Sequence, residues 1–176
     1  MMKPMVYNAG QWHDFFVMVG GGAAALTGLV FVAMTLNLET ITKDATHRYR
    51  AIGTLVGFTA VFIMCALALM GVERYQAVGA EWLVVATIAG VIYVYGYVEA
   101  IRSGGSSAGL HGYRVVAGTT CYLAQIIGSL FLLLGHSAGL YTAAAAMVIY
   151  FALLISGAWL LIVGVYQDQI KTDEHA

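Results

Sequence analysis

The chain has 176 residues, of which 61% are hydrophobic and only 10% are charged, whereas roughly a quarter are charged in an ordinary soluble domain. This composition excludes a soluble monomeric domain, and the net charge of -1 excludes the basic surface that nucleic-acid binding needs. We therefore expect an integral membrane protein that contacts the lipid bilayer and binds no nucleic acid.

Five long apolar stretches follow one another along the chain, and each is long enough to cross a membrane as a helix. A spanning helix needs about 20 predominantly apolar residues, because the hydrocarbon core of a bilayer is roughly 30 Å thick. Since backbone polar groups must be paired inside lipid, the predicted fold is all-α, a polytopic transmembrane helix bundle that forms one integral membrane domain over residues 1–176. The predicted spans are 15–38, 51–72, 78–101, 113–134 and 141–166.

Basic residues in the connections predict the orientation, because cytoplasmic loops carry an excess of Lys and Arg. Lys3 and Arg74 lie on the N-terminal side of the predicted spans. The opposite side carries more of them: Lys43, Arg48, Arg50, Arg102, Arg114 and Lys171. This distribution predicts an N-terminus outside the cell and a C-terminus in the cytoplasm.

Small residues form a stripe on the first predicted span, where Gly20, Ala24 and Gly28 recur at i, i+4 and i+8 and so share one helix face. The second span begins with a GxxxG pair, Gly53 and Gly57. Helices associate in lipid through close backbone packing, which small residues permit. These residues predict helix-packing faces within the bundle or between copies of the chain. Lining of a pore by the first stripe is the alternative.

The first span also carries a resemblance. The residues from Trp12 to Ile41 are WHDFFVMVGGGAAALTGLVFVAMTLNLETI, and this run resembles the opening of small, uncharacterised bacterial inner-membrane proteins. Over the rest of the chain the resemblance extends only to the hydropathy. It implies a multi-pass protein of the bacterial cytoplasmic membrane, and it implies no activity and no site residues.

A polar face is predicted on the fourth span. Gln125 lies near its centre, and Tyr122, three residues before it, and Ser129, four residues after it, lie on the same helix face. An amide in hydrocarbon must find partners inside the protein or in a cavity. This face therefore predicts either a structural hydrogen bond between helices or the lining of a polar path. Asn37, at the end of the first span, is a further candidate for a lining residue at a pore mouth.

Residues that carry catalysis or bind cofactors do not converge in the sequence. All five histidines lie outside the predicted spans, and the chain has neither an HExxH nor a CxxC motif. We therefore predict no catalytic residue, no metal site and no cofactor, and a haem held by loop histidines is a less favoured alternative. Cys65 and Cys121 lie at different depths and are expected to be free thiols.

These observations predict a non-catalytic membrane protein rather than an enzyme. The first hypothesis is an accessory or interaction subunit that packs through small-residue helix faces, either as a homo-oligomer or in a larger membrane complex. The alternative is a small homo-oligomeric channel or facilitator for a neutral solute or ion. Its lining would be the face of Gln125 or the face of Gly20 and Gly28.

Overall fold

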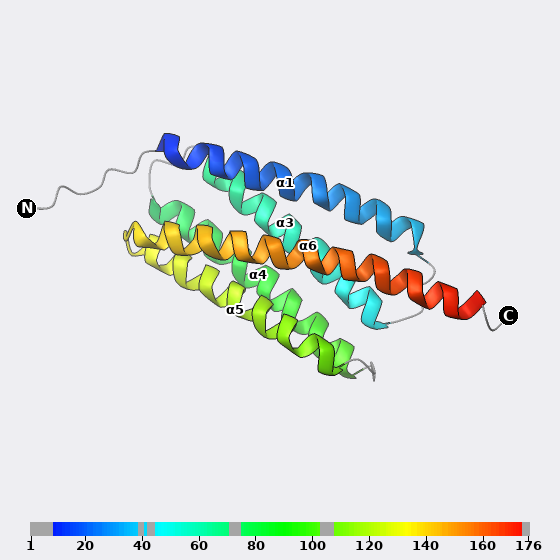
Figure 1. Ribbon diagram of the computed structural model, residues 1–176. Coiled ribbons are helices and arrows are strands. Elements are labelled where there is room, and N and C mark those ends of the chain that lie inside the picture. Colours follow the sequence, from blue (N-terminus) through cyan, green and yellow to red (C-terminus); the bar gives the residue numbers. More distant parts are fainter. Residues whose placement is uncertain (1–8, 39–40, 42–44, 71–74, 103–107, 174–176) are drawn as a thin grey trace, which may run out of the picture.

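Five long helices dominate the computed structural model, which describes residues 9–38, 41, 45–70, 75–102 and 108–173 (Figure 1). The helices are α1 (Ala9–Leu36), α3 (Ala45–Leu69), α4 (Tyr75–Arg102), α5 (Ala108–Leu133) and α6 (Ala138–Asp173). Each is long and apolar enough to cross a membrane. The five apolar helices indicate an integral, multi-pass membrane protein.

The helices contain most of each predicted span and extend beyond it at several ends. α1 begins at Ala9 rather than 15, and α3 begins at Ala45 rather than 51. The first, second and fourth predicted spans end slightly beyond α1, α3 and α5, and positions 71 and 72 of the second lie outside the described residues. The 36 residues of α6 measure about 54 Å at roughly 1.5 Å each, which exceeds the hydrocarbon thickness of roughly 30 Å. Hydropathy marks only the apolar part of a helix, and helical hydrogen bonding continues into the polar interface.

Four of the helices form a closed ring. α3 packs on α4, α4 on α5, α5 on α6, and α6 returns to α3. α1 lies outside this ring and packs mainly on α3, with a minor contact to α6 (Figure 1). The first turn of α1 and the last turn of α6 lie at opposite ends of the bundle, as five crossings require. We call the end where α1 begins the N-terminal end.

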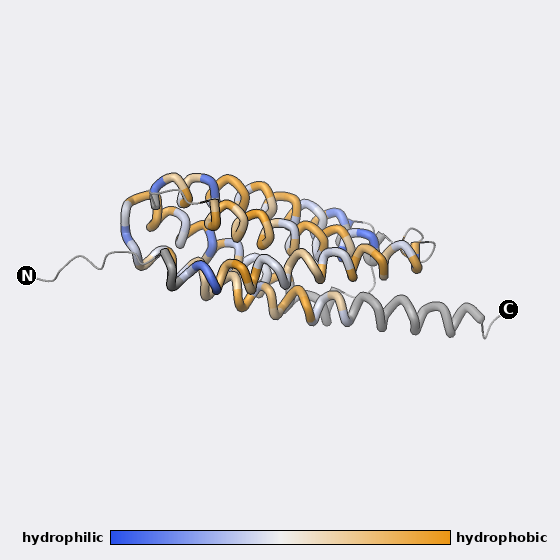
Figure 2. The backbone as a smooth tube through the Cα atoms, turned by 90° about the horizontal axis from the view of Figure 1, so that it is seen from above, coloured by the Kyte–Doolittle hydropathy of each residue, from blue (hydrophilic) through white to orange (hydrophobic). Residues whose placement is uncertain are grey.

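Hydrophobic residues cover the length of the helices, and hydrophilic residues gather near the helix ends (Figure 2). Large apolar side chains point away from the bundle, among them Met18 and Val116, which are 69% and 67% exposed. Trp82 is fully buried, and its Nε1 donates a hydrogen bond to the Met64 carbonyl at 2.8 Å. Its ring also meets Phe16 of α1 edge to face, with centroids 5.7 Å apart. Trp82 of α4 therefore holds α1 and α3 in register.

A tight turn joins α5 to α6. Gly135 has a φ of 83°, a left-handed conformation that glycine adopts without steric cost. The His136 amide donates to the Phe131 carbonyl and the Gly135 amide donates to the Leu132 carbonyl, both at 2.9 Å, which is a Schellman cap. α6 begins at Ala138, so the two helices lie antiparallel and adjacent.

Near the N-terminal end, α5 makes backbone contact with both neighbours. A Cβ atom added to Gly79 of α4 would lie 2.6 Å from the Leu133 nitrogen. A Cβ atom added to Gly128 of α5 would lie 2.9 Å from the Ala143 nitrogen on α6. A Cβ atom on Gly139 would overlap the Gly128 carbonyl. Because only glycine leaves this space, these three positions set the narrow width of the ring at this end.

Candidate functional site

The predicted small-residue stripe on α1 divides between two surfaces. Gly20 packs on α3, where an added Cβ would lie 2.9 Å from the Cys65 Cβ. Ala24 is exposed, and Gly28 is exposed with no other atom within 4 Å of an added Cβ. Steps of four residues rotate by about 40° each around a helix with 3.6 residues per turn. The stripe therefore turns away from α3 within two steps, and Ala23, which is fully buried, takes the inner position instead.

The exposed small residues form a surface of their own, which we call the α1 outer face. It consists of Gly21, Ala24, Ala25 and Gly28, all of which are exposed. These residues recur at i, i+3, i+4 and i+7, the spacing of one helix face. Neither Gly21 nor Gly28 has another atom within 4 Å of an added Cβ. The α1 outer face is thus a shallow strip of backbone that no described residue covers.

The second predicted pair, Gly53 and Gly57, faces the interior of the ring. An added Cβ on Gly53 would lie 3.8 Å from the Tyr93 ring. An added Cβ on Gly57 would lie 2.7 Å from the Tyr150 hydroxyl and 2.6 Å from a methyl group of Leu154. This GxxxG pair gives space to tyrosine side chains from α4 and α6 rather than to the backbone of another helix.

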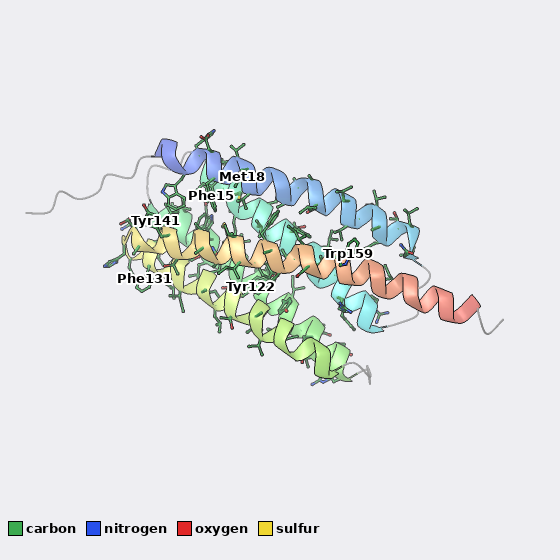
Figure 3. The ribbon with its side chains drawn as sticks, in the orientation of Figure 1. Phe15, Met18, Tyr122, Phe131, Tyr141 and Trp159 are labelled. Carbon is green, nitrogen blue, oxygen red and sulfur yellow. The ribbon has the colours of Figure 1, made fainter. Side chains whose placement is uncertain are left out.

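Three tyrosines meet inside the ring, one from each of α4, α5 and α6, and we call Tyr93, Tyr122 and Tyr150 the tyrosine cluster. The rings of Tyr93 and Tyr122 lie 5.5 Å apart, and those of Tyr122 and Tyr150 lie 4.9 Å apart. The Tyr150 hydroxyl donates to the Tyr122 hydroxyl at 2.8 Å. A Cβ atom added to Gly118 of α5 would overlap the Tyr93 hydroxyl. A Cβ atom added to Gly90 of α4 would lie 3.6 Å from the Tyr122 ring. Figure 3 places Tyr122 in the middle of the bundle.

The predicted polar face of α5 lies inside the same ring. Tyr122, Gln125 and Ser129 are 7%, 6% and 0% exposed. The Ser129 hydroxyl donates to the Gln125 backbone carbonyl at 2.8 Å, which leaves the Gln125 side chain to other partners. Among the described residues, the Gln125 Nε2 atom is buried and has no hydrogen-bond acceptor. The face therefore points into a single chain and does not form part of its outer surface.

Asn37 lies apart from this cluster. It follows the last residue of α1, and its Nδ2 atom donates to the Ala33 carbonyl at 2.9 Å. Its side chain thus pairs with a carbonyl in the last turn of its own helix. The structure brings Tyr122, Gln125 and Ser129 together and leaves Asn37 at the opposite end of α1 from Phe16.

Two members of the tyrosine cluster, Tyr93 and Tyr150, were not among the site residues predicted from the sequence. Tyrosines inside a span are a signal for such a cluster, but the pairing of three helices decides which of them meet. Cys65 and Cys121 are both buried free thiols. No group of three or more His, Cys, Asp or Glu side chains gathers within the described part of the chain. The side chains of His47, His111 and His175 lie outside the described residues.

Comparison of the chain with models of protein families, with curated proteins and with solved structures gives no match. Its functional interpretation therefore rests on two features of the helices. One is the uncovered α1 outer face, and the other is the polar interior formed by the tyrosine cluster and Gln125.

Proposed function

We propose that this protein is a non-catalytic accessory or interaction subunit of a membrane, which binds a further transmembrane helix through the α1 outer face. One observation carries the proposal: α1 lies outside the four-helix ring and presents a strip of exposed small residues. The partner helix belongs to a second copy of the chain or to another membrane protein.

The physical argument concerns how helices associate in lipid. Lipid tails are as apolar as leucine, so burial of apolar surface does not drive transmembrane helices together. Close packing does, and it needs residues without bulky side chains at the contact. α4 presents a different surface to its surroundings, because Val84, Ile88 and Val91 are large, exposed and spaced along one face. The α1 outer face is therefore suited to a helix, and the α4 face to lipid.

Insertion in a bacterial cytoplasmic membrane, with the N-terminal end outside, completes the proposal. The six Lys and Arg residues on the side of the C-terminus, against two on the other side, support this orientation. Arg48, Arg50 and Arg102 lie at the ends of α3 and α4 that are remote from the N-terminal end. The resemblance of the first span to bacterial inner-membrane proteins supports the compartment.

Site-specific photo-crosslinking in native membranes tests the proposed contact. A photoreactive residue at Ala25, on the α1 outer face, is expected to yield a crosslink to protein. The matched position is Ile88, which is exposed on α4 and is expected to yield lipid adducts only. Lipid adducts alone from both positions would contradict the proposal.

A channel or facilitator for a neutral solute is the second candidate, and the buried Gln125 favours it. Because the Gln125 face lies inside the ring, a path lined by it would run through one chain rather than between copies. Flux into liposomes, measured for the native chain and for Gln125→Leu, tests this function. A flux that Gln125→Leu leaves unchanged would remove Gln125 from the lining.

A further inference from the structure

Two hydrogen-bond donors close together on α5 have no acceptor in the described part of the chain. The Gln125 Nε2 atom is buried near the middle of the span Val115–Leu133 and is unpaired. The Tyr122 hydroxyl accepts a hydrogen bond from Tyr150 and has no second partner among the described residues, so its own proton is also unpaired. Residues at i and i+3 are neighbours on a helix face, about 5–6 Å apart at Cβ. Both donors therefore point into the same part of the ring.

Buried polar groups without a partner are rare, because each costs the free energy of its lost hydration. The cost is larger in a membrane, where the surrounding lipid supplies no substitute. Ser129 does not remove this cost for Gln125, since its hydroxyl donates to the backbone carbonyl rather than binding the amide. An acceptor that does not belong to the chain would pair both donors at once.

Close packing of the helices limits the size of such an acceptor. Toward the N-terminal end, Gly79 and Gly128 bring α4, α5 and α6 into backbone contact. On the other side, the tyrosine cluster fills the ring from α4, α5 and α6. Between these two levels, the buried polar atoms without a partner among the described residues are the Gln125 Nε2 atom on α5 and the Glu81 Oε2 atom on α4. Close packing at both levels therefore limits a bound molecule to one or a few heavy atoms.

Charge also restricts the acceptor. The polar residues that are buried as a whole in the described part of the chain are Thr54, Gln125 and Ser129, and Glu81 of α4 has a buried Oε2 atom; none of these groups is a cation. An anion held there would lose its hydration without a compensating cation, which is prohibitively unfavourable. A neutral acceptor meets no such penalty, and water both accepts and donates, so it can pair with the amide, the phenol and the free lone pairs of the Ser129 hydroxyl.

We propose that the ring interior holds a small neutral hydrogen-bond acceptor the size of a water molecule, bound by the Gln125 amide and the Tyr122–Tyr150 hydroxyl pair. The bound molecule accepts hydrogen bonds from Gln125 and Tyr122 of α5 at mid-membrane depth, and the Tyr122 hydroxyl links it to Tyr150 of α6. This site does not involve the α1 outer face, so a test of the site does not depend on the interaction proposed above.

A double-mutant cycle tests the site through its shared ligand. Gln125→Met removes the amide at nearly constant volume, and Tyr122→Phe removes the unpaired hydroxyl one turn away. If both groups bind one molecule, the two losses of stability are coupled and the double variant loses less than their sum. Tyr122→Phe with Trp82→Phe is the matched control pair, because Trp82 donates to Met64 instead, and additive losses are expected there.

The direction in which Gln125→Met alone shifts the SDS unfolding midpoint also tests the site. With a bound acceptor, Gln125→Met is expected to unfold at a lower fraction of SDS than the native chain. A higher or unchanged midpoint would overturn the proposal, because removing an unpaired buried amide stabilises a protein. Additive losses in the cycle would overturn it as well.

Nuclear magnetic resonance on the native chain provides a readout that needs no stable variant. The chain is labelled with ¹⁵N-glutamine and placed in lipid nanodiscs, and Gln125→Met assigns the signal. The Gln125 side-chain amide is expected to show cross-relaxation with water, or with a small neutral molecule retained from the membrane. Cross-relaxation with aliphatic and aromatic protons alone would contradict the site.

Discussion

Replacing Gly79 by alanine tests the packing of α4 on α5 most severely. An added Cβ would lie 2.6 Å from the Leu133 nitrogen, 2.9 Å from the Ser129 oxygen and 3.0 Å from the Leu132 carbonyl carbon. All three are backbone atoms, so none of them can rotate out of the way. Heavy atoms are at their optimum about 3.5–4.0 Å apart, and the two helices must therefore separate by roughly 1 Å at this level.

The expected loss follows from two opposing contributions. Overpacking of a well-packed core typically costs about 1–3 kcal/mol, and a backbone collision belongs at the upper limit of this range. Alanine recovers about 0.5–1 kcal/mol over glycine inside a helix. We therefore expect Gly79→Ala to lower the free energy of unfolding by about 2 kcal/mol, which is a factor of roughly 30 in the folding equilibrium.

Unfolding by SDS in mixed micelles, followed by tryptophan fluorescence, measures this loss, because Trp82 lies fully buried in the core. Gly28→Ala is the matched control, since no other atom lies within 4 Å of its added Cβ. We expect Gly28→Ala to be as stable as the native chain or more so. Equal midpoints for Gly79→Ala and Gly28→Ala would refute the close approach of α4 and α5.

Three further substitutions test the packing of the ring by the same unfolding in SDS, which is followed by circular dichroism for Trp82→Phe because that change removes the buried fluorescent reporter. Gly57→Ala is expected to cost less than Gly79→Ala, about 1 kcal/mol, because the atoms that it meets are the ends of the Tyr150 and Leu154 side chains, which can shift; an equal loss for the two would contradict this difference. Tyr150→Phe removes one hydrogen bond in the membrane and is expected to cost about 0.6–1.7 kcal/mol, whereas an unchanged midpoint would argue against the hydroxyl pair. Trp82→Phe loses the bond to the Met64 carbonyl and part of a fully buried ring, and a loss of about 2 kcal/mol is expected; a loss below that of Tyr150→Phe would be inconsistent with its burial.

Hydropathy alone locates the five helices, because the bilayer sets both their length and their composition. It does not locate their ends. Residues 45–50 of α3 include Thr46, Arg48 and Arg50, and they are helical although they lie outside the apolar stretch. A helix at a polar interface needs no apolar side chains to keep its hydrogen bonds, so composition carries little signal there.

The rotation of α1 about its own axis is not encoded in its small residues. Gly20, Ala24 and Gly28 are chemically alike, yet Gly20 is buried and the other two are exposed. Large partners decide between them, since Phe16 of α1 packs on Trp82 of α4 and fixes the inner face. This contact joins residues far apart in the sequence, and a pattern within one helix cannot reveal it.

The interior position of Gln125 follows from the sequence, whereas the tyrosine cluster does not. A lone amide in an apolar span has few alternatives to the bundle interior, because lipid offers it no partner. Tyr93 and Tyr150 meet Tyr122 only because the glycines at 57, 90 and 118 open space opposite them on three different helices. The relative depth of those helices depends on the turns between them, such as the cap at Gly135.

Native mass spectrometry of the chain, extracted gently from its own membrane, tests the central claim that the α1 outer face binds a partner helix. We expect a complex of fixed stoichiometry, with a second copy or another membrane protein. We also expect Ala25→Phe to dissociate this complex and Ile88→Phe, on the exposed face of α4, to leave it intact. A native chain that leaves the membrane only as a monomer, or a complex that Ala25→Phe does not weaken, would contradict the claim.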